Sequence, residues 1–339
     1  MTDSDTDAAV LDRADVAAAL EVAVRAPSIH NTQPWAWRLG PDTLVLRADR
    51  DRQLAVADPD GHSLLISCGA ALHLTEVALR AQGWQVTTTL LPDRGDPDAL
   101  ACFRATGRQD PDEDAVADAE AALARRSDRR PFATRELPAE LLDALQRVAG
   151  DAAAHLHVPT QPDRRIDLAV AVSWADRIER DDEAYKTEMN HWLHDPEVHA
   201  MVDGVPVEAI PHVPDDAPRH TDVPLRDFEV GVTGKLLIER DIDEKPLIAV
   251  VLTDFDNPAD HLQAGRAMMR LMLAAQRRGL STCPLSQAVD LAAFRTRVQR
   301  AMGWVGHPQM MLRLGYPSGP IDQLIRTPRR GVAAVLTVA

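Results

Sequence analysis

Hydrophobic and polar positions along the chain follow helical and strand periods in two successive blocks. Apolar residues at helical spacing predict long helices over 11–25, 63–82, 163–180 and 259–278. Shorter helical patterns cover 116–126 and 137–145. Alternating or continuous apolar runs predict strands over 35–38, 43–48, 85–91, 101–105, 155–158, 247–253 and 310–314. The chain is therefore expected to fold as an α+β protein.

The two blocks share one order of elements: helix, strand, helix, glycine stop, strand. The helix that stops at Gly83 in the first block corresponds to the helix that stops at Gly279 in the second. This shared order predicts an internal duplication. The expected parts are a flexible tail over 1–9, a first half over 10–120 and a second half over 121–339. Within the second half, about 181–244 is rich in proline and poor in regular patterns, which predicts a lid or a binding loop.

Composition and charge narrow the range of partners. The chain carries 37 Lys and Arg against 52 Asp and Glu, a net charge of −15 that disfavours nucleic acid as a partner. No apolar run has the roughly 18 residues of a membrane span, and the acidic start is unlike a signal peptide. Three cysteines without a Cys-x-x-Cys pair predict reduced packing residues. We expect a cytoplasmic protein without a membrane partner.

The loop over 25–35 concentrates the candidate chemistry. Pro27 ends the preceding helix, because its ring prevents the helix from continuing. Ser28, Asn31 and Gln33 then bring polar side chains together just before the large apolar surface of Trp35. Such a loop is suited to bind the edge of a planar polar heterocycle. From the residue types alone, a structural helix-to-strand turn is an equal alternative.

The string Ala-Pro-Ser-x-x-Asn-x-Gln-Pro-Trp over 26–35 resembles the signature of the nitroreductase superfamily, FMN oxidoreductases that fold as α+β homodimers. The fuller segment over 24–37 resembles the Acg branch of actinobacterial single-chain relatives. The resemblance implies a nitroreductase-like fold in which two half-repeats pack as an intramolecular pseudo-dimer that holds one FMN. The protein would then be a monomer or a homodimer of such chains.

The resemblance also implies how the two halves share the flavin site. The first half would contact the ring through Pro27, Ser28, Asn31 and Gln33. The second half would bind the phosphate through Arg125, Ser127 and Arg129 and through the basic tail residues Arg326, Arg329 and Arg330. Pro284, Leu285 and Ser286 would lie near flavin N5, where the backbone N–H groups of the last two face the ring. Arginine suits a phosphate because its planar fork donates bidentate hydrogen bonds; the alternative is a solvated helix end and a basic tail.

Two functions remain open at this point. The resemblance implies NAD(P)H-dependent, ping-pong reduction of a nitroaromatic or quinone-type small-molecule acceptor at flavin N5, with NADPH or NADH as donor and no catalytic side chain assigned. The alternative is a catalytically silent FMN-binding protein that sequesters an occluded flavin and is linked to stress or dormancy. Complete loss of flavin binding is a third possibility.

Other motifs predict less. His191, His194 and His199 lack a defined further metal ligand, so we assign no metal site and expect a surface or lid helix there. The segment 231–235 superficially resembles a phosphate loop. Glu229 replaces its first glycine and Leu236 its Ser or Thr, so this motif fails.

Overall fold

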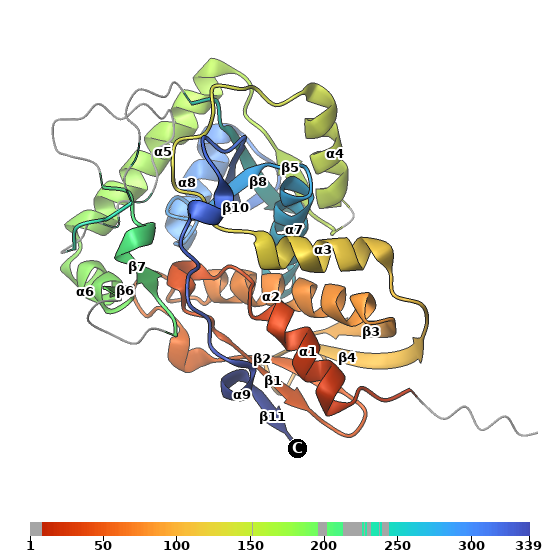
Figure 1. Cartoon of the computed structure of the whole chain (residues 1–339). Coiled ribbons are helices and arrows are strands. Elements are labelled where there is room, and N and C mark those ends of the chain that lie inside the picture. The colour runs from red at the N-terminus through yellow and green to blue at the C-terminus, as the bar shows by residue number, and fades with distance from the viewer. Residues whose placement is uncertain are drawn as a thin grey trace, which may run out of the picture.

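The computed structural model describes residues 9–150, 152–195, 202–212, 226, 228, 232–236, 238 and 244–339. Two β-sheets lie on opposite sides of a pair of crossing central helices, one sheet built mainly from the first half of the chain and one from the second (Figure 1). The predicted α+β class is confirmed.

The first sheet has the strand order β11-β1-β2-β4-β3. Its strands are β1 (Trp35–Leu39), β2 (Leu44–Ala48), β3 (Trp84–Leu90), β4 (Ala99–Arg108) and β11 (Leu336–Val338). The last of these comes from the C-terminal end of the chain and pairs in parallel with β1, while the other neighbours are antiparallel. The C-terminal segment therefore crosses from the second half to complete the sheet of the first (Figure 1).

The second sheet has the order β5-β8-β10-β9, and all its pairs are antiparallel. Its strands are β5 (His155–His157), β8 (Leu247–Thr253), β9 (Ser281–Leu285) and β10 (His307–Gly315). Taken in chain order within each half, the four strands of this sheet have the same spatial order as β1 to β4. The continuous apolar run of β8 is buried, as its sequence predicts.

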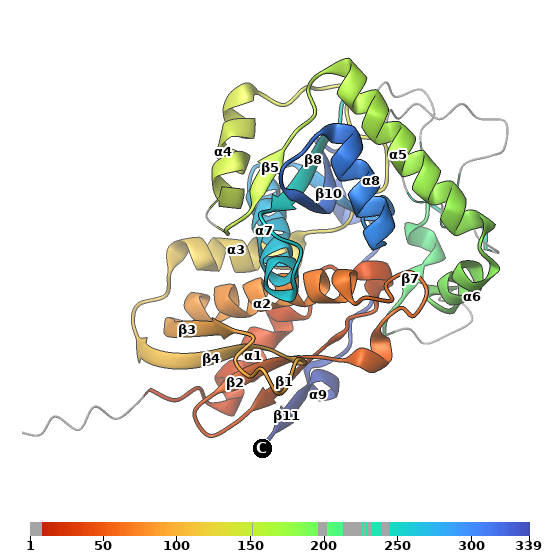
Figure 2. The same ribbon diagram turned by 180° about the vertical axis from the view of Figure 1, so that it is seen from behind.

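The two central helices are α2 (His62–Ala81) and α7 (Pro258–Gln276), which cross between the sheets (Figure 2). Asn257 and Asp260 form a capping box that starts α7. Among the described residues, α2 alone has the length and apolar composition of a membrane span, and 83% of that window is buried inside the protein. Helices α1 (Arg13–Ala23), α3 (Glu113–Ala124) and α4 (Ala139–Gly150) pack around this pair.

The predicted excursion contains more regular structure than its prolines indicate. The long helix α5 (Pro162–Asp181) runs along the outside of the second half and leads into α6 (Glu183–His191) (Figure 2). Short strands β6 (Leu193–His194) and β7 (Val205–Pro206) then pair in parallel. The expectation of few regular elements over 181–195 was therefore wrong, because Asp182 caps α6 through the backbone N–H groups of Ala184 and Tyr185.

Four further elements lie outside the predicted ranges: the helices α8 (Ala292–Met302) and α9 (Val332–Val335) and the strands β9 and β11. Helix α8 interrupts the second half between β9 and β10, and its mixed polar pattern gave little periodic signal. Strand β11 spans only three residues. The remaining predicted helices and strands of the described residues are confirmed, with ends shifted by a few residues.

Candidate functional site

Two adjoining clefts lie where the two halves of the chain meet. The inner cleft is lined by residues that include Ser63, Ser67, Met268 and the segment 283–287. The outer cleft is lined by residues that include four arginines. Both are lined by Pro27, Ser28, His30, Ser127 and Arg129, so they form one continuous groove.

The loop that forms the first-half wall has an unusual backbone. His30, Asn31 and Gln33 all have positive φ angles, of 44°, 55° and 52°. This conformation is disfavoured for residues with a side chain, and such strain clusters at ligand-binding sites. Hydrogen bonds hold the loop: Ser67 Oγ accepts from Ile29 N at 3.2 Å, and Ser28 Oγ accepts from Gln33 N at 2.9 Å.

The polar side chains at the end of this loop bind mainly to other parts of the chain. Asn31 lines the outer cleft and donates to the carbonyl oxygens of Gly204 and Pro328, while its own Oδ1 is buried without a partner. Gln33 is fully buried and accepts from Arg330 N at 2.8 Å. Arg330 also pairs with Asp49. Gln33 and Arg330 thus lie outside the lining of both clefts and fasten the C-terminal segment to the loop.

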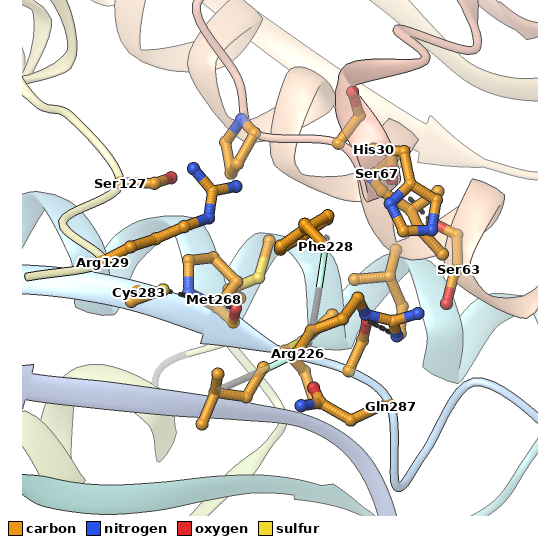
Figure 3. Close-up of a pocket in the computed structure, with 18 residues that line it drawn as sticks. His30, Ser63, Ser67, Ser127, Arg129, Arg226, Phe228, Met268, Cys283 and Gln287 are labelled. Atoms are coloured by element: carbon orange, nitrogen blue, oxygen red, sulfur yellow. Dashed lines mark hydrogen bonds between the residues drawn. The ribbon is translucent and has the colours of Figure 1, made fainter. Parts of the chain in front are cut away.

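The second-half wall is the segment around Ser127, which docks on β9. Ser127 and Thr282 form a parallel bridge, and Asp128 N donates to Thr282 O at 3.0 Å. Asp128 is completely buried and holds Arg130 in an ion pair of 2.9 Å. These contacts leave Ser127 and Arg129 directed into the groove, as Figure 3 shows for the inner cleft.

The outer cleft is rich in arginine. Arg125, Arg126, Arg129 and Arg329 line it, and Glu208 is the one carboxylate among its described lining residues. Burial, with Arg126 nearby, lowers the pKa of Arg125 to about 10. Burial and the neighbouring guanidinium groups lower the pKa of Arg329 to about 9.

Several donors in this cleft lack acceptors. Arg125 Nη2 donates to Arg25 O, and Arg329 Nη2 donates to Ala26 O. The Nε and Nη1 atoms of Arg125 and the Nε of Arg329 are buried without a partner in the described structure. Because buried polar groups are almost always hydrogen-bonded, this donor set fits a multiply charged anion such as a phosphate.

The segment expected near the flavin ring lines the inner cleft. Pro284, Leu285 and Ser286 all belong to its wall, and Leu285 is the last residue of β9. Ser286 Oγ donates to Asp290 at 3.1 Å. Arg326 instead lies beyond the outer cleft, in a smaller pocket. The structure thus brings Pro27, Ser28, Arg125, Ser127, Arg129 and Arg329 together with this segment around one groove.

A buried ionic cluster supports the inner cleft. Arg226, itself a wall residue, pairs with Glu179 at 3.2 Å and with Asp290. Asp290 also accepts from Ser63 Oγ at 2.9 Å. Although burial opposes it, these carboxylates hold the pKa of Arg226 well above its ordinary value.

Phe228 and His30 face each other across the inner cleft. Phe228 lies between His30 and Arg129 (Figure 3), with its ring 5.9 Å from the imidazole and 5.0 Å from the guanidinium carbon. Burial, then the charges of Arg226 and Arg129, lower the pKa of His30 well below its ordinary value, so the imidazole is neutral. No sequence motif marks Ser63, Ser67, Arg226 or Phe228, because none belongs to the recognised loop.

A group of side chains outside the groove has metal-ligand chemistry. Ligand atoms of His62, Asp256 and His261 lie within 4.8 Å of one another. Each histidine already has a partner at Nε2, Gln309 for His62 and Asp256 for His261. Arg295 lies 3.5 Å from Asp256 and opposes a cation there. Of the histidines considered from the sequence, His191 ends α6, His194 belongs to β6, and His199 lies outside the described residues.

Comparisons with known proteins agree on one family. The model of the Nitroreductase family matches residues 122–316. Rv3131 of Mycobacterium tuberculosis, provisionally named an NAD(P)H nitroreductase, is 35% identical over 96% of this chain and 92% of its own. The acg protein of the same organism, also provisionally named an NAD(P)H nitroreductase, is 31% identical over 95% of each chain. The FMN and NADPH-dependent nitroreductase NfnB of Sphigopyxis sp. strain HMH aligns with 65% of this chain and 97% of its own, at 17% identity and a TM-score of 0.41.

Proposed function

This chain belongs to the nitroreductase family, and we propose that it is an FMN-binding, NAD(P)H-dependent oxidoreductase. The observation that carries the proposal is the groove between the halves. Its ring-side wall has the strained loop with Pro27 and Ser28, and its far end has buried arginine donors without acceptors. An apolar cleft that continues into a cationic one suits a flavin with a terminal phosphate.

Each part of the groove suits a different part of FMN. Ser127, Arg125, Arg129 and Arg329 would hold the phosphate, since they supply a hydroxyl and the donors described above. Pro27 and Ser28 would contact one side of the ring, and Leu285 and Ser286 would present backbone to it from the other half. Gln33, Arg330 and Arg326 are left out of this proposed contact set. Gln33 and Arg330 bind each other, and Arg326 lies beyond the cleft.

Catalysis would need little from side chains. When bound, FMN supplies the redox chemistry, hydride transfer from NADPH or NADH and then reduction of a nitroaromatic or quinone-type acceptor in ping-pong order. The chain would orient the ring through the loop and β9, and exclude water through Met268 and Phe228. The guanidinium groups of Arg129 and Arg226 would favour negative charge in the cleft.

We further propose that one chain is a pseudo-dimer with one such groove. Three observations support this: the shared four-strand order of the two sheets, the crossing of α2 with α7, and a match of the family model to the second half. Ring-loop residues come from the first half, and the segments 125–129 and 283–287 come from the second. The proposed setting is the cytoplasm, with the three cysteines as free thiols.

An anaerobic visible spectrum tests the oxidoreductase. The purified protein is loaded with FMN, and the flavin absorbance is followed before and after excess NADPH and, separately, NADH. We expect prompt bleaching of the bound flavin by at least one donor, followed by recovery on addition of a quinone. A protein that binds no FMN contradicts the proposal at its first step, and one that binds FMN but is not bleached contradicts the enzymatic part.

A second candidate function is sequestration of an occluded FMN. The observation that favours it is the position of Arg226 and Phe228, two residues of the excursion whose side chains line the inner cleft. Phe228 lies between His30 and Arg129 (Figure 3), where it would cover a ring bound in this cleft. Bound flavin that NADPH leaves oxidised, and that solvent quenchers do not reach, would favour this function over turnover.

A further inference from the structure

A third, smaller hollow continues the groove beyond the outer cleft. This shallow arginine pocket is lined by Arg25, Arg125, Arg126, Arg326 and Arg329. It shares Arg125, Arg126 and Arg329 with the outer cleft, whereas Arg25 and Arg326 line the arginine pocket alone. Its lining contains no carboxylate among the described residues.

Three of these guanidinium groups, those of Arg125, Arg126 and Arg329, have hydrogen bonds in the described structure, and all their acceptors are neutral, whereas Arg326 is exposed. Arg126 Nη1 donates to the carbonyl oxygens of Leu123 and Ala124, which end α3. In the described part of the chain, none of the five arginines forms an ion pair. Besides the Nε atoms of Arg125 and Arg329, which also face the outer cleft, the Nε atoms of Arg25 and Arg126 are buried and have no acceptor in the described structure. These two additional donors indicate that the pocket is built for an acceptor from outside the chain.

The charge of a single phosphate does not balance these side chains. Together with Arg129, six guanidinium groups surround the outer cleft and the arginine pocket, and they face one carboxylate, Glu208. The C-terminal ends of α1 and α3 add roughly half a negative charge each. A phosphate monoester adds close to two more. About two positive charges remain, in a chain whose net charge is −15.

We propose that the arginine pocket is a second phosphate subsite, adjacent to the one that would hold the flavin phosphate. Its distinguishing residues are Arg25 and Arg326, and Arg125, Arg126 and Arg329 face both subsites. The relation to a flavin phosphate rests on the proposed function, but the subsite itself does not. The second phosphate belongs either to the cofactor, as in the pyrophosphate of FAD, or to a separate molecule such as NADPH.

The first experiment measures the affinity of the subsite for phosphate groups in the absence of a flavin. Inorganic pyrophosphate is titrated into the flavin-free full-length protein by calorimetry at low ionic strength, where charge interactions are least screened. We expect tight binding, weakened at least about tenfold in the double variant Arg25→Gln with Arg326→Gln, because each lost arginine removes a charged hydrogen bond. The control is Arg94→Gln, which removes one exposed positive charge outside the lining of this pocket and of both clefts and should leave binding unchanged.

A second experiment identifies the source of the phosphate. If the cofactor supplies it, FAD binds the flavin-free protein more tightly than FMN, and the double variant abolishes that difference. If a separate molecule supplies it, the FMN-loaded protein binds NADPH more tightly than NADH, and the double variant removes that preference. FMN affinity should change less than about threefold in the double variant, because Arg125, Ser127, Arg129 and Arg329 remain.

Three results overturn the proposal. Pyrophosphate could bind the wild-type protein no better than chloride, or bind the double variant as well as the wild type. The double variant could also lose as much affinity for FMN as for pyrophosphate, which would make the pocket part of a single phosphate site. Failure of FMN to bind at all would contradict the proposed function, and the pyrophosphate titration would still report on the subsite.

Discussion

Gly69 of α2 and Gly265 of α7 lie against each other at the crossing of the two central helices. A Cβ on Gly69 would overlap the carbonyl oxygen of Leu262 and lie 3.0 Å from Gly265 Cα. A Cβ on Gly265 would overlap the carbonyl oxygen of Ile66, four residues into α2. The contact is reciprocal, because the Cβ added at each glycine would meet the carbonyl oxygen three residues before the other glycine. It therefore sets how closely the two halves, and the two walls of the groove, approach.

Replacing either glycine should destabilise the protein sharply. Gly69→Ala and Gly265→Ala each place a methyl group against backbone, which cannot move aside as a side chain can. We expect each to lower the free energy of unfolding by about 3 kcal/mol, in the upper range for overpacked cores. Urea unfolding followed by circular dichroism measures this change.

Gly150→Ala is the matched control, since nothing lies within 4 Å of the Cβ added there, at the last residue of α4. Its effect should stay below about 1 kcal/mol, and should stabilise rather than destabilise because alanine is the better helix former. A Gly69→Ala protein as stable as this control would show that the helices can separate without cost.

The arginines proposed to bind phosphate can be distinguished by mutation from Arg330, whose contacts are structural. The double variant Arg125→Ala with Arg329→Ala should weaken the binding free energy of FMN by about 2–5 kcal/mol, the range for truncating charged contacts. Both side chains line the outer cleft, and their unpartnered nitrogens are the donors that a phosphate would use. Fluorescence titration of FMN into the flavin-free protein gives the dissociation constants.

Arg330→Ala serves as the control for that pair. Its guanidinium binds Gln33 O, Trp35 O and Asp49 rather than the cleft. We expect it to lower the melting temperature while changing the affinity for FMN less than the double variant does. The opposite order of affinities would return Arg330 to the set of phosphate contacts that the resemblance implies.

The sequence predicted the parts of the groove but not how they are joined. Pro27 and Ser28 were found because the whole loop is contiguous in the chain, and Arg125, Ser127 and Arg129 because they form one short motif. Their placement on one groove depends on contacts such as Ser127 with Thr282, which are 155 residues apart. Gln33 matches the recognised motif equally well, yet its hydrogen bonds go to Val202 and Arg330. A motif identifies residue types, whereas tertiary contacts decide which of them face a ligand.

The residues missed by the sequence are those without local signals. Arg226 and Phe228 lie in a proline-rich stretch where no periodic pattern marks an inward-facing position. Ser63 and Ser67 sit on the buried helix α2, whose polar side chains look like ordinary helix residues in one sequence. Strand β11 was missed because three residues are too few to establish alternation.

Acid should destabilise the protein through buried neutral histidines. Burial, then the charges of Arg295 and His261, lower the pKa of His62 well below the ordinary value of 6.5. The unfolded chain therefore takes up a proton below pH 6.5 that the folded chain does not, and stability falls as the pH falls. The slope reaches about 1.4 kcal/mol per pH unit for each such group.

His62→Gln tests this dependence while keeping a donor toward Gln309, which accepts from His62 Nε2 at 2.7 Å. The free energy of unfolding, measured in urea between pH 7 and pH 5, should fall less steeply in the variant than in the wild type. His155→Gln, in which an imidazole with a 64% exposed side chain is replaced, is the control for loss of a surface histidine. Equal slopes in all three proteins would show that His62 does not contribute to the pH dependence of the free energy of unfolding.

Phe228→Ala should open the inner cleft and speed reduction of the bound flavin. The Phe228 ring stands edge-on to His30 and under the Arg129 guanidinium, so its removal clears the space between them. We expect a several-fold faster bleaching by NADPH in anaerobic stopped flow, together with stronger quenching of flavin fluorescence by iodide. Phe255→Ala, which truncates a 67% exposed ring outside the groove, should change neither quantity. If Phe228→Ala also changes neither, this side chain does not limit access to the ring, and sequestration loses the observation that favours it.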